Sequence, residues 1–447
     1  MSIPNQNAKV YTINKESPYY REMIPRPMFE GIWMKAKQMA LGYNCKLDPS
    51  HAALYQEKWP EIEKYLDMPF FKESMYEMFA GCHDTQSLMF QDMMRSAVAK
   101  IVGYGRFCIE RDMYKEELDK VQIKNPMYVI SLPRSGSTLT HKILCNDPKS
   151  HPMLVYEHLS AGSKTMTEEG RIAFSETILK QVQNDSEDIN KVHYVSSVKE
   201  PEEETFFMEI LALTYMFGTC LPRWEQYRES LFTRDWSPVY EALIYSMKMS
   251  CVERPLVDNG HILLKCACHF LTPIPFFNVM CADEINPRIV WIHREPVDEF
   301  KSCFYLLLNA RARFKGDIGE EDMKWLQETI LEMNEISLRN AIYIREHWIA
   351  ENPERKKYII DMAFKEMITD PIAASKKIYD YFGMEVTDEM VEGIKETVEK
   401  KDPQGKHGRK VKKDDEFFIS DEQIRDKFKW YYEKFSEYLP NYWEKKE

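Results

Sequence analysis

A turn rich in serine, Ser131-Leu-Pro-Arg-Ser-Gly-Ser-Thr138, carries the residues of this chain best suited to chemistry. The apolar run Met127–Ile130 precedes it, and the amphipathic run Leu139–Leu144 follows it. This order predicts a strand, a tight turn and the start of a helix. Backbone N–H groups at such a turn point outward, and the helix dipole adds partial positive charge. The segment therefore predicts a cradle for a phosphate or sulfate group.

The turn mimics the spacing of a Walker A loop but departs from it at two positions. Ser137 stands where that loop has its Lys, and Ser131 stands where it has its first Gly. The cationic group is Arg134, which lies inside the turn. We therefore expect the loop to hold a phosphate ester, but not in the manner of an ATPase.

A second segment predicts another anion site at the end of a later strand. The apolar run Ile289–Ile292 leads into His293-Arg-Glu-Pro296, and Pro suits the first position of a helix. Ligands of open parallel sheets bind at the carboxyl ends of the strands, and Arg294 is expected at such an end. Ser302 follows about two helical turns later, so the pair would grip a phosphate with charge-assisted hydrogen bonds. Alternatively, Arg294 pairs with a helix carboxylate and Ser302 is an ordinary surface residue.

Taken together, Pro133–Thr138 and the pair Arg294 and Ser302 resemble the two signatures of the sulfotransferases that use 3′-phosphoadenosine 5′-phosphosulfate (PAPS). The resemblance runs from about Met127 to Arg409 and includes His141, Asp147-Pro148, Tyr156-Glu157-His158, Leu263–Phe270, Tyr358–Gly383 and Gly405–Arg409. The chain departs from the family at Cys266-Ala267, where the family has Ser-Pro, and at Tyr156, where it has Trp. Neither change removes a charged partner.

The resemblance implies roles for both segments. The residues implied to hold the 5′-phosphosulfate are Arg134, Ser135, Gly136, Ser137 and Thr138. The residues implied to hold the 3′-phosphate end are Arg294, Ser302 and a late basic loop of Lys406, His407, Gly408 and Arg409. Adenosine 3′,5′-bisphosphate (PAP) would be the released product, and the transfer requires no metal.

Transfer to a hydroxyl also needs a general base, and the sequence offers several candidates. Glu157 follows a short expected strand, Met153–Tyr156, where partial burial would raise its pKa. His269 lies just past another expected strand, and histidine suits proton transfer near neutral pH. Both stay open, with His158 behind them, and His269 is otherwise a histidine that caps a strand end. Lys265 would assist the sulfuryl oxygens, or it is only a strand-end lysine.

Composition limits the function classes. The 447 residues carry a formal net charge of −12, which disfavours a general nucleic-acid or heparin binder, because such a protein needs a broad basic face. The N-terminus lacks a secretory pattern and no apolar run reaches about 18 residues, so we expect a cytoplasmic protein with reduced thiols and no transmembrane helix. Cys266, Cys268 and His269 lack a second ligand pair, so we expect a buried strand there and no metal site.

The apolar pattern changes character at Asn125-Pro126. Helical spacing dominates from Met28 to about Asp119, and short apolar strands alternate with helices from Met127 on. The expected strands are 127–132, 262–266, 288–292 and 357–361. The expected helices are 139–145, 168–183, 203–216, 235–250, 297–312, 321–349, 364–382, 388–399 and 421–438.

This alternation predicts an α/β fold, with a P-loop-like parallel β-sheet flanked by helices. We expect an N-terminal arm and helical cap over 1–124. An α/β domain over 125–447 follows, with a helical insertion at about 160–258 and a helical C-terminal tail.

The sequence thus predicts a sulfotransferase that moves a sulfuryl group from PAPS to the hydroxyl of a small-molecule alcohol, phenol, lipid or sugar. Two rivals remain. A P-loop nucleotide kinase or phosphotransferase would depend on Mg²⁺ and would need Lys at position 137. A non-catalytic nucleotide-binding relative would keep the cradle without the base. The sequence names neither the acceptor nor the oligomeric state.

Overall fold

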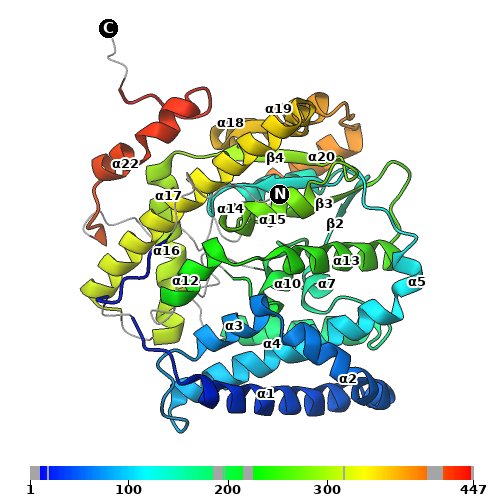
Figure 1. Ribbon diagram of the computed structural model, residues 1–447. Helices are drawn as coiled ribbons and strands as arrows, with labels where there is room; N and C mark the ends of the chain where they lie inside the picture. Colours follow the sequence, from blue (N-terminus) through cyan, green and yellow to red (C-terminus); the bar gives the residue numbers. More distant parts are fainter. Residues whose placement is uncertain are drawn as a thin grey trace.

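A parallel sheet of five strands, in the order β2-β3-β1-β4-β5, organises the α/β part of the molecule (Figure 1). The computed structural model describes residues 11–17, 20–184, 195, 197–214, 225–315, 318–399 and 416–443. The strands are β1 (Met127–Ile130), β2 (Ser150–Pro152), β3 (His261–Lys265), β4 (Arg288–His293) and β5 (Ile359–Ala363). In the register of the sheet, Met127 lies opposite Leu263 on one side and Arg288 on the other. The predicted α/β class and parallel sheet are confirmed.

Helices cover both faces of the sheet because alternate residues of each strand point to opposite sides. Val129 and Met362 pack on one face, in a cluster with apolar residues of α6, α18, α19 and α20. Tyr128 and Trp291 pack on the other face, in the larger core. The bounds on the first face are α6 (Ser137–Leu144), α18 (Phe364–Thr369), α19 (Pro371–Tyr381) and α20 (Asp388–Glu399). Those on the second face include α14 (Cys268–Leu271), α15 (Pro273–Pro275), η2 (Phe276–Met280), α16 (Pro296–Lys315) and α17 (Glu320–Glu351).

The structure differs from the expected elements at Met153–Tyr156 and at 364–382. The expected strand Met153–Tyr156 is instead a turn into α7 (Val155–Leu159), because Glu157 accepts the Leu154 N–H at 2.8 Å and so caps a helix start. The expected single helix over 364–382 is two helices, α18 and α19. Pro371 cannot continue α18, and it begins α19 with the carboxylate of Asp370 accepting the Ala373 N–H.

The N-terminal helices precede the sheet, and α1 to α4 lie at the end of the molecule opposite α18 to α20 (Figure 1). They are α1 (Arg26–Leu47), η1 (Pro49–His51), α2 (Ala52–Leu66), α3 (Pro69–Met78), α4 (Leu88–Met113) and α5 (Lys115–Leu118). Helix α4 meets the inserted helix α10 through Phe107 and Phe207, whose ring centres are 5.2 Å apart. The apolar residues of these helices belong to the same cluster as one face of the sheet.

The described residues of the expected insertion and tail form several helices. Their helices are α8 (Glu168–Asn184), α10 (Thr205–Ile210), α12 (Glu225–Thr233), α13 (Ser237–Glu253) and α22 (Asp421–Lys434), and η3 (Pro353–Tyr358) precedes β5. Helix α10 is shorter than predicted, because Ala212 adopts a left-handed backbone (φ 66°) just after it. Helix α22 packs beside the tip of β4, where the Tyr431 hydroxyl lies 2.7 Å from His293 Nδ1.

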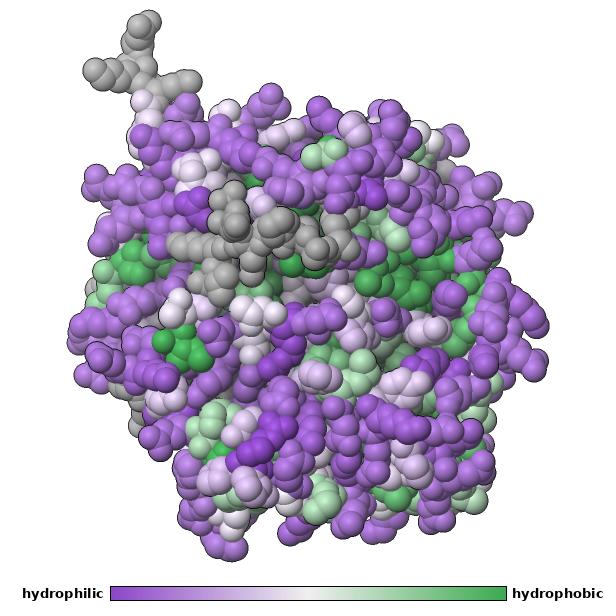
Figure 2. Space-filling view, in the orientation of Figure 1, coloured by the Kyte–Doolittle hydropathy of each residue, from purple (hydrophilic) through white to green (hydrophobic). Residues whose placement is uncertain are grey.

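The face of the molecule in Figure 2 is mostly hydrophilic, with scattered apolar patches. Within the described ranges, no helix combines the length and apolar character needed to cross a membrane.

Candidate active site

The loop between β1 and α6 has an unfavourable backbone conformation that the surrounding structure must stabilise. Arg134 (φ 61°) and Gly136 (φ 83°) both lie in the left-handed region, which is costly for a residue with a side chain. A Cβ on Gly136 would come within 2.4 Å of the Phe364 ring, so only glycine fits there. Helix α6 begins directly after, at Ser137, so its free N–H groups face the loop.

The structure brings the two predicted anion-binding segments into direct contact. Arg294, just past the end of β4, donates a hydrogen bond from Nη1 to the carbonyl oxygen of Arg134. Arg134 in turn donates from Nε to Ser302 Oγ at 3.2 Å. Strands β1 and β4 are parallel neighbours, so their carboxyl ends lie side by side. Arg134, Arg294 and Ser302 therefore form one site.

A cavity of about 670 Å³ opens over this site. Its cationic lining residues are Arg134, Lys142 and Arg294, and the loop contributes Gly136, Ser137 and Thr138. Phe364, at the start of α18, forms another wall and lies under the Arg294 guanidinium, 4.5 Å from the ring centre. The chain is acidic as a whole, so this local gathering of positive charge favours an anionic ligand.

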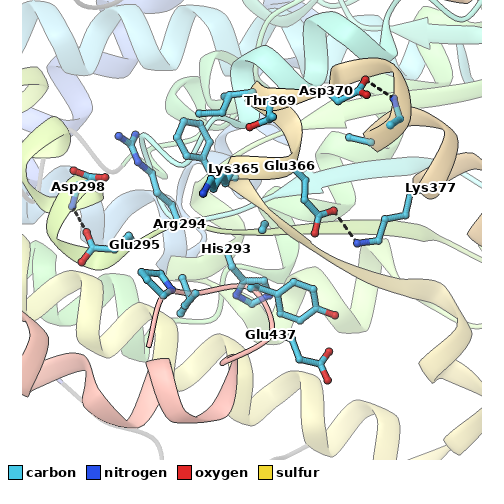
Figure 3. A pocket seen from close by; sticks show the side chains of 18 of the residues that line it. His293, Arg294, Glu295, Asp298, Lys365, Glu366, Thr369, Asp370, Lys377 and Glu437 are labelled. Atoms are coloured by element: carbon cyan, nitrogen blue, oxygen red, sulfur yellow. Dashed lines mark hydrogen bonds and ion pairs between the residues drawn. The ribbon is translucent and has the colours of Figure 1, made fainter. Parts of the chain in front are cut away.

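Arg294 also borders a second cavity of about 920 Å³, which Figure 3 shows. Arg294 and Lys365 both line this cavity, and Glu366 and Lys377 form an ion pair there at 2.7 Å. Phe364 and Ile368 line both cavities, so these two side chains and Arg294 form the partition between them.

Lys265, at the end of β3, connects the loop to a pair of carboxylates. Its Nζ lies 3.3 Å from Thr138 Oγ1, 3.2 Å from Glu203 and 3.4 Å from Glu202. Burial alone would lower the pKa of Lys265, but the charges of Glu203 and Glu202 outweigh it and raise that pKa. Lys265 is therefore a buried permanent cation beside the loop between β1 and α6.

This acidic segment was not among the site residues predicted from the sequence. Glu202, Glu203 and Glu204 follow Pro201 as three consecutive acidic residues just before an apolar run. That signal was present, but nothing in the sequence connects it to Lys265, which lies about 60 residues later.

The sulfotransferase family model matches residues 126–388, more than half of the chain. The chain belongs to the sulfotransferase family. Its fold is similar to that of sulfotransferase STF9 from Mycobacterium avium, with a TM-score of 0.62 and 16% identity over 82% of this chain and 90% of that one. Sulfotransferase STF1 from Mycobacterium tuberculosis H37Rv also has a TM-score of 0.62, with 14% identity over 88% of this chain and 97% of that one. No curated protein gives a sequence match.

His269 of this sulfotransferase lies inside the core, in α14. Its Nε2 is 2.8 Å from Glu204 and its Nδ1 is 3.0 Å from the Tyr240 hydroxyl, while Phe276 stacks on its ring at 4.3 Å. Burial alone would raise the pKa of Glu204, but the hydrogen bond with His269 outweighs it and lowers that pKa. These contacts occupy both ring nitrogens of His269.

Glu157 of the sulfotransferase anchors α7 to α13. Arg254 donates two hydrogen bonds to its carboxylate, each 2.8 Å long, and Ser250 donates a third at 3.0 Å. Burial alone would raise the pKa of Glu157, but the hydrogen bonds and charge of Arg254 outweigh it and lower that pKa. The predicted raised pKa was therefore wrong. His158, next to it, has its pKa lowered by burial, and its Nε2 lies 3.2 Å from the Glu202 carbonyl oxygen.

The predicted late basic loop, Lys406, His407, Gly408 and Arg409, lies outside the described residues. Cys266 and Cys268 do not lie on one strand as predicted, because β3 ends at Lys265 and α14 begins at Cys268. In the described part of the chain, no group of three His, Cys, Asp or Glu side chains is arranged to hold a metal ion.

Proposed function

We propose that this sulfotransferase moves a sulfuryl group from PAPS to the hydroxyl of a small or medium-sized acceptor and releases PAP. The observation that carries the proposal is the contact between the Arg134 loop and Arg294 within one cavity. Two arginines at the ends of neighbouring strands can bind a nucleotide that carries phosphate groups at two positions. The cavity volume is within the usual range for small-ligand sites, about 300 to 1,000 Å³.

Two further features support the fit of the donor nucleotide. The Nε atom of Arg294 is buried and has no hydrogen-bond partner among the described residues, so it is available to an anion. Phe364 presents an aromatic wall next to both arginines, against which a purine ring could stack. Ser302 would add a hydroxyl at the Arg294 end, once a phosphate replaces its contact with Arg134.

The donor supplies an activated SO₃ unit bonded to the 5′-phosphate. The N–H groups at the start of α6 and the guanidinium of Arg134 would bind that phosphate and stabilise the negative charge that develops on it. A preorganised donor of this kind contributes about 3 to 4 kcal/mol to the transition state. Arg134 keeps its charge at any working pH, and its planar fork fixes the phosphate orientation. Lys265, beside Thr138, would balance charge on the sulfuryl oxygens.

The N-terminal helices and the insertion would shape the acceptor pocket. In this proposal residues 1–124 form the cap and residues 125–447 form the catalytic domain. Helix α10 belongs to the insertion, lies against α4 of the cap and follows the acidic segment at Lys265. An acceptor held between these parts would reach the loop from the Lys265 side.

Thermal-shift titration of the full chain tests the donor. We expect PAP to raise the melting temperature in a saturable way, and ATP with Mg²⁺ to raise it far less. Transfer of labelled sulfate from PAPS to at least one member of a panel of alcohols, phenols and sugars completes the test. A larger shift with ATP and Mg²⁺ would favour a nucleotide kinase, and PAP binding without transfer to any acceptor would favour a non-catalytic relative.

A further inference from the structure

The acidic segment Glu202–Glu204 is held firmly at the end of β3. The Glu202 N–H donates to the Met153 carbonyl oxygen at 3.3 Å, and the Lys265 N–H donates to Glu204 at 3.1 Å. Glu200 and Pro201, which precede it directly, line the cavity over the phosphate-binding loop. The segment therefore stands at the edge of the candidate active site in a defined position.

The three carboxylates differ in their exposure and in the protein groups that they already contact. The side chain of Glu204 is fully buried and bonded to His269 and to the backbone of Lys265. The side chain of Glu202 is 6% exposed and accepts the Glu203 N–H at 3.0 Å as well as contacting Lys265. The side chain of Glu203 is 20% exposed. Glu203 is therefore the carboxylate of the three that a second molecule can reach most easily.

Glu203 is also connected through Lys265 to Thr138 of the loop. Its Oε2 lies 3.2 Å from Lys265 Nζ, which lies 3.3 Å from Thr138 Oγ1. Lys265 would thus lie between an acceptor oxygen beside Glu203 and the loop that binds the 5′-phosphate in the proposed function. The Glu157 carboxylate and both ring nitrogens of His269 are instead occupied by protein partners.

We propose that Glu203 is the general base that accepts the acceptor's proton, with Lys265 as the residue that positions it. This inference rests on the proposed sulfuryl transfer. As the acceptor oxygen bonds to sulfur, its O–H bond breaks and the proton passes to the Glu203 carboxylate. The bond between sulfur and the bridging oxygen breaks at the same time, and its electron pair stays on the 5′-phosphate of PAP.

The experiment compares Glu203→Gln and Glu203→Ala with wild type and with Glu209→Gln as a matched control. Glu209 lies on α10, a few residues after the acidic segment, and its half-exposed carboxylate lies 3.7 Å from Lys100 Nζ. Turnover is measured with labelled PAPS and the best alcohol from the acceptor panel, and PAP affinity is measured by titration calorimetry.

We expect kcat to fall about 10²- to 10⁴-fold in both Glu203 variants, the usual contribution of a general base, while PAP affinity stays within about twofold. Formate should restore part of the turnover of Glu203→Ala only, because a small carboxylate can occupy the vacated space. Glu209→Gln should behave as wild type.

Full turnover in Glu203→Gln would overturn the inference, and so would a loss of turnover that formate does not restore. A large loss in Glu157→Gln or His269→Ala at unchanged PAP affinity, with Glu203→Gln active, would assign the base elsewhere. If wild type transfers sulfate to no acceptor, the proposed function fails instead, and that result is separate from the behaviour of the Glu203 variants.

Discussion

Glu299 provides a quantitative test of the charge arrangement behind the two arginines. It lies on α16, is 2% exposed, and accepts one hydrogen bond from Asn334 of α17 at 2.6 Å. Its other oxygen, Oε1, is buried and has no hydrogen-bond partner in the described ranges. The charged and titratable groups that face it are Arg294 beyond β4, Arg134 of the loop and Tyr431 of α22.

Burial raises the pKa of Glu299 from its ordinary 4.5 to about 8, because desolvation outweighs the attraction of Arg294 and Arg134. The folded protein therefore keeps a proton that the unfolded chain releases. This stabilising contribution is complete below about pH 4.5 and is lost as the pH rises to about 8. The two pKa values differ by about 3.5 pH units, which corresponds to about 5 kcal/mol at most and about 4 kcal/mol between pH 5 and pH 9.

The variant Glu299→Gln removes this titration and keeps the acceptor oxygen for Asn334. We expect denaturant unfolding to show a wild-type stability that falls by about 4 kcal/mol more than that of the variant between about pH 5 and pH 9. Glu328→Gln, an exposed change on α17, is the control and should follow wild type. Parallel stability curves for wild type and Glu299→Gln would refute the reasoning, because they would mean that Glu299 does not titrate in this range.

Three further changes test the site. Gly136→Ala should weaken PAP binding at least about tenfold, measured by calorimetry, and destabilise the fold by about 1 to 3 kcal/mol, measured by unfolding. Gly42→Ala, at an exposed position inside α1 where a Cβ meets nothing within 4 Å, should do neither. Glu157→Gln should cost about 1 to 3 kcal/mol of unfolding free energy with PAP affinity unchanged, since it weakens the charge-assisted hydrogen bonds between a buried carboxylate and the partly exposed Arg254. Ser302→Ala should weaken PAP binding about tenfold but leave adenosine 5′-phosphate binding within about twofold; equal losses would contradict its place at the 3′-phosphate.

The sequence predicted what depends on local order. The strand, turn and helix around Arg134 follow from an apolar run, a glycine and an amphipathic run that are adjacent in the chain. The position of Arg294 at the end of β4 and of Ser302 two turns into α16 follows in the same way. The carboxyl ends of parallel strands lie at one edge of a sheet. A parallel sheet therefore predicts that Arg134 and Arg294 lie close together.

What depends on distant partners could not be predicted. The environment of Glu157 is set by Arg254, about 97 residues later, whose hydrogen bonds lower the pKa that the sequence was expected to raise. The contact between Glu203 and Lys265 depends on how β3 packs beside the acidic segment, which the sequence alone does not show. His269 is likewise removed from solvent by Tyr240 and Phe276, which belong to other elements.

In the proposed function, Arg134 and Arg294 hold two phosphates of one nucleotide. The most direct measurement is the ratio of affinities for PAP and adenosine 5′-phosphate, in wild type and in Arg294→Ala. We expect wild type to prefer PAP by about 10- to 100-fold, as a charge-assisted contact contributes about 1.5 to 3 kcal/mol, and Arg294→Ala to lose that preference. Arg95→Ala, at an exposed position of α4, should keep it. An unchanged preference in Arg294→Ala would contradict the account.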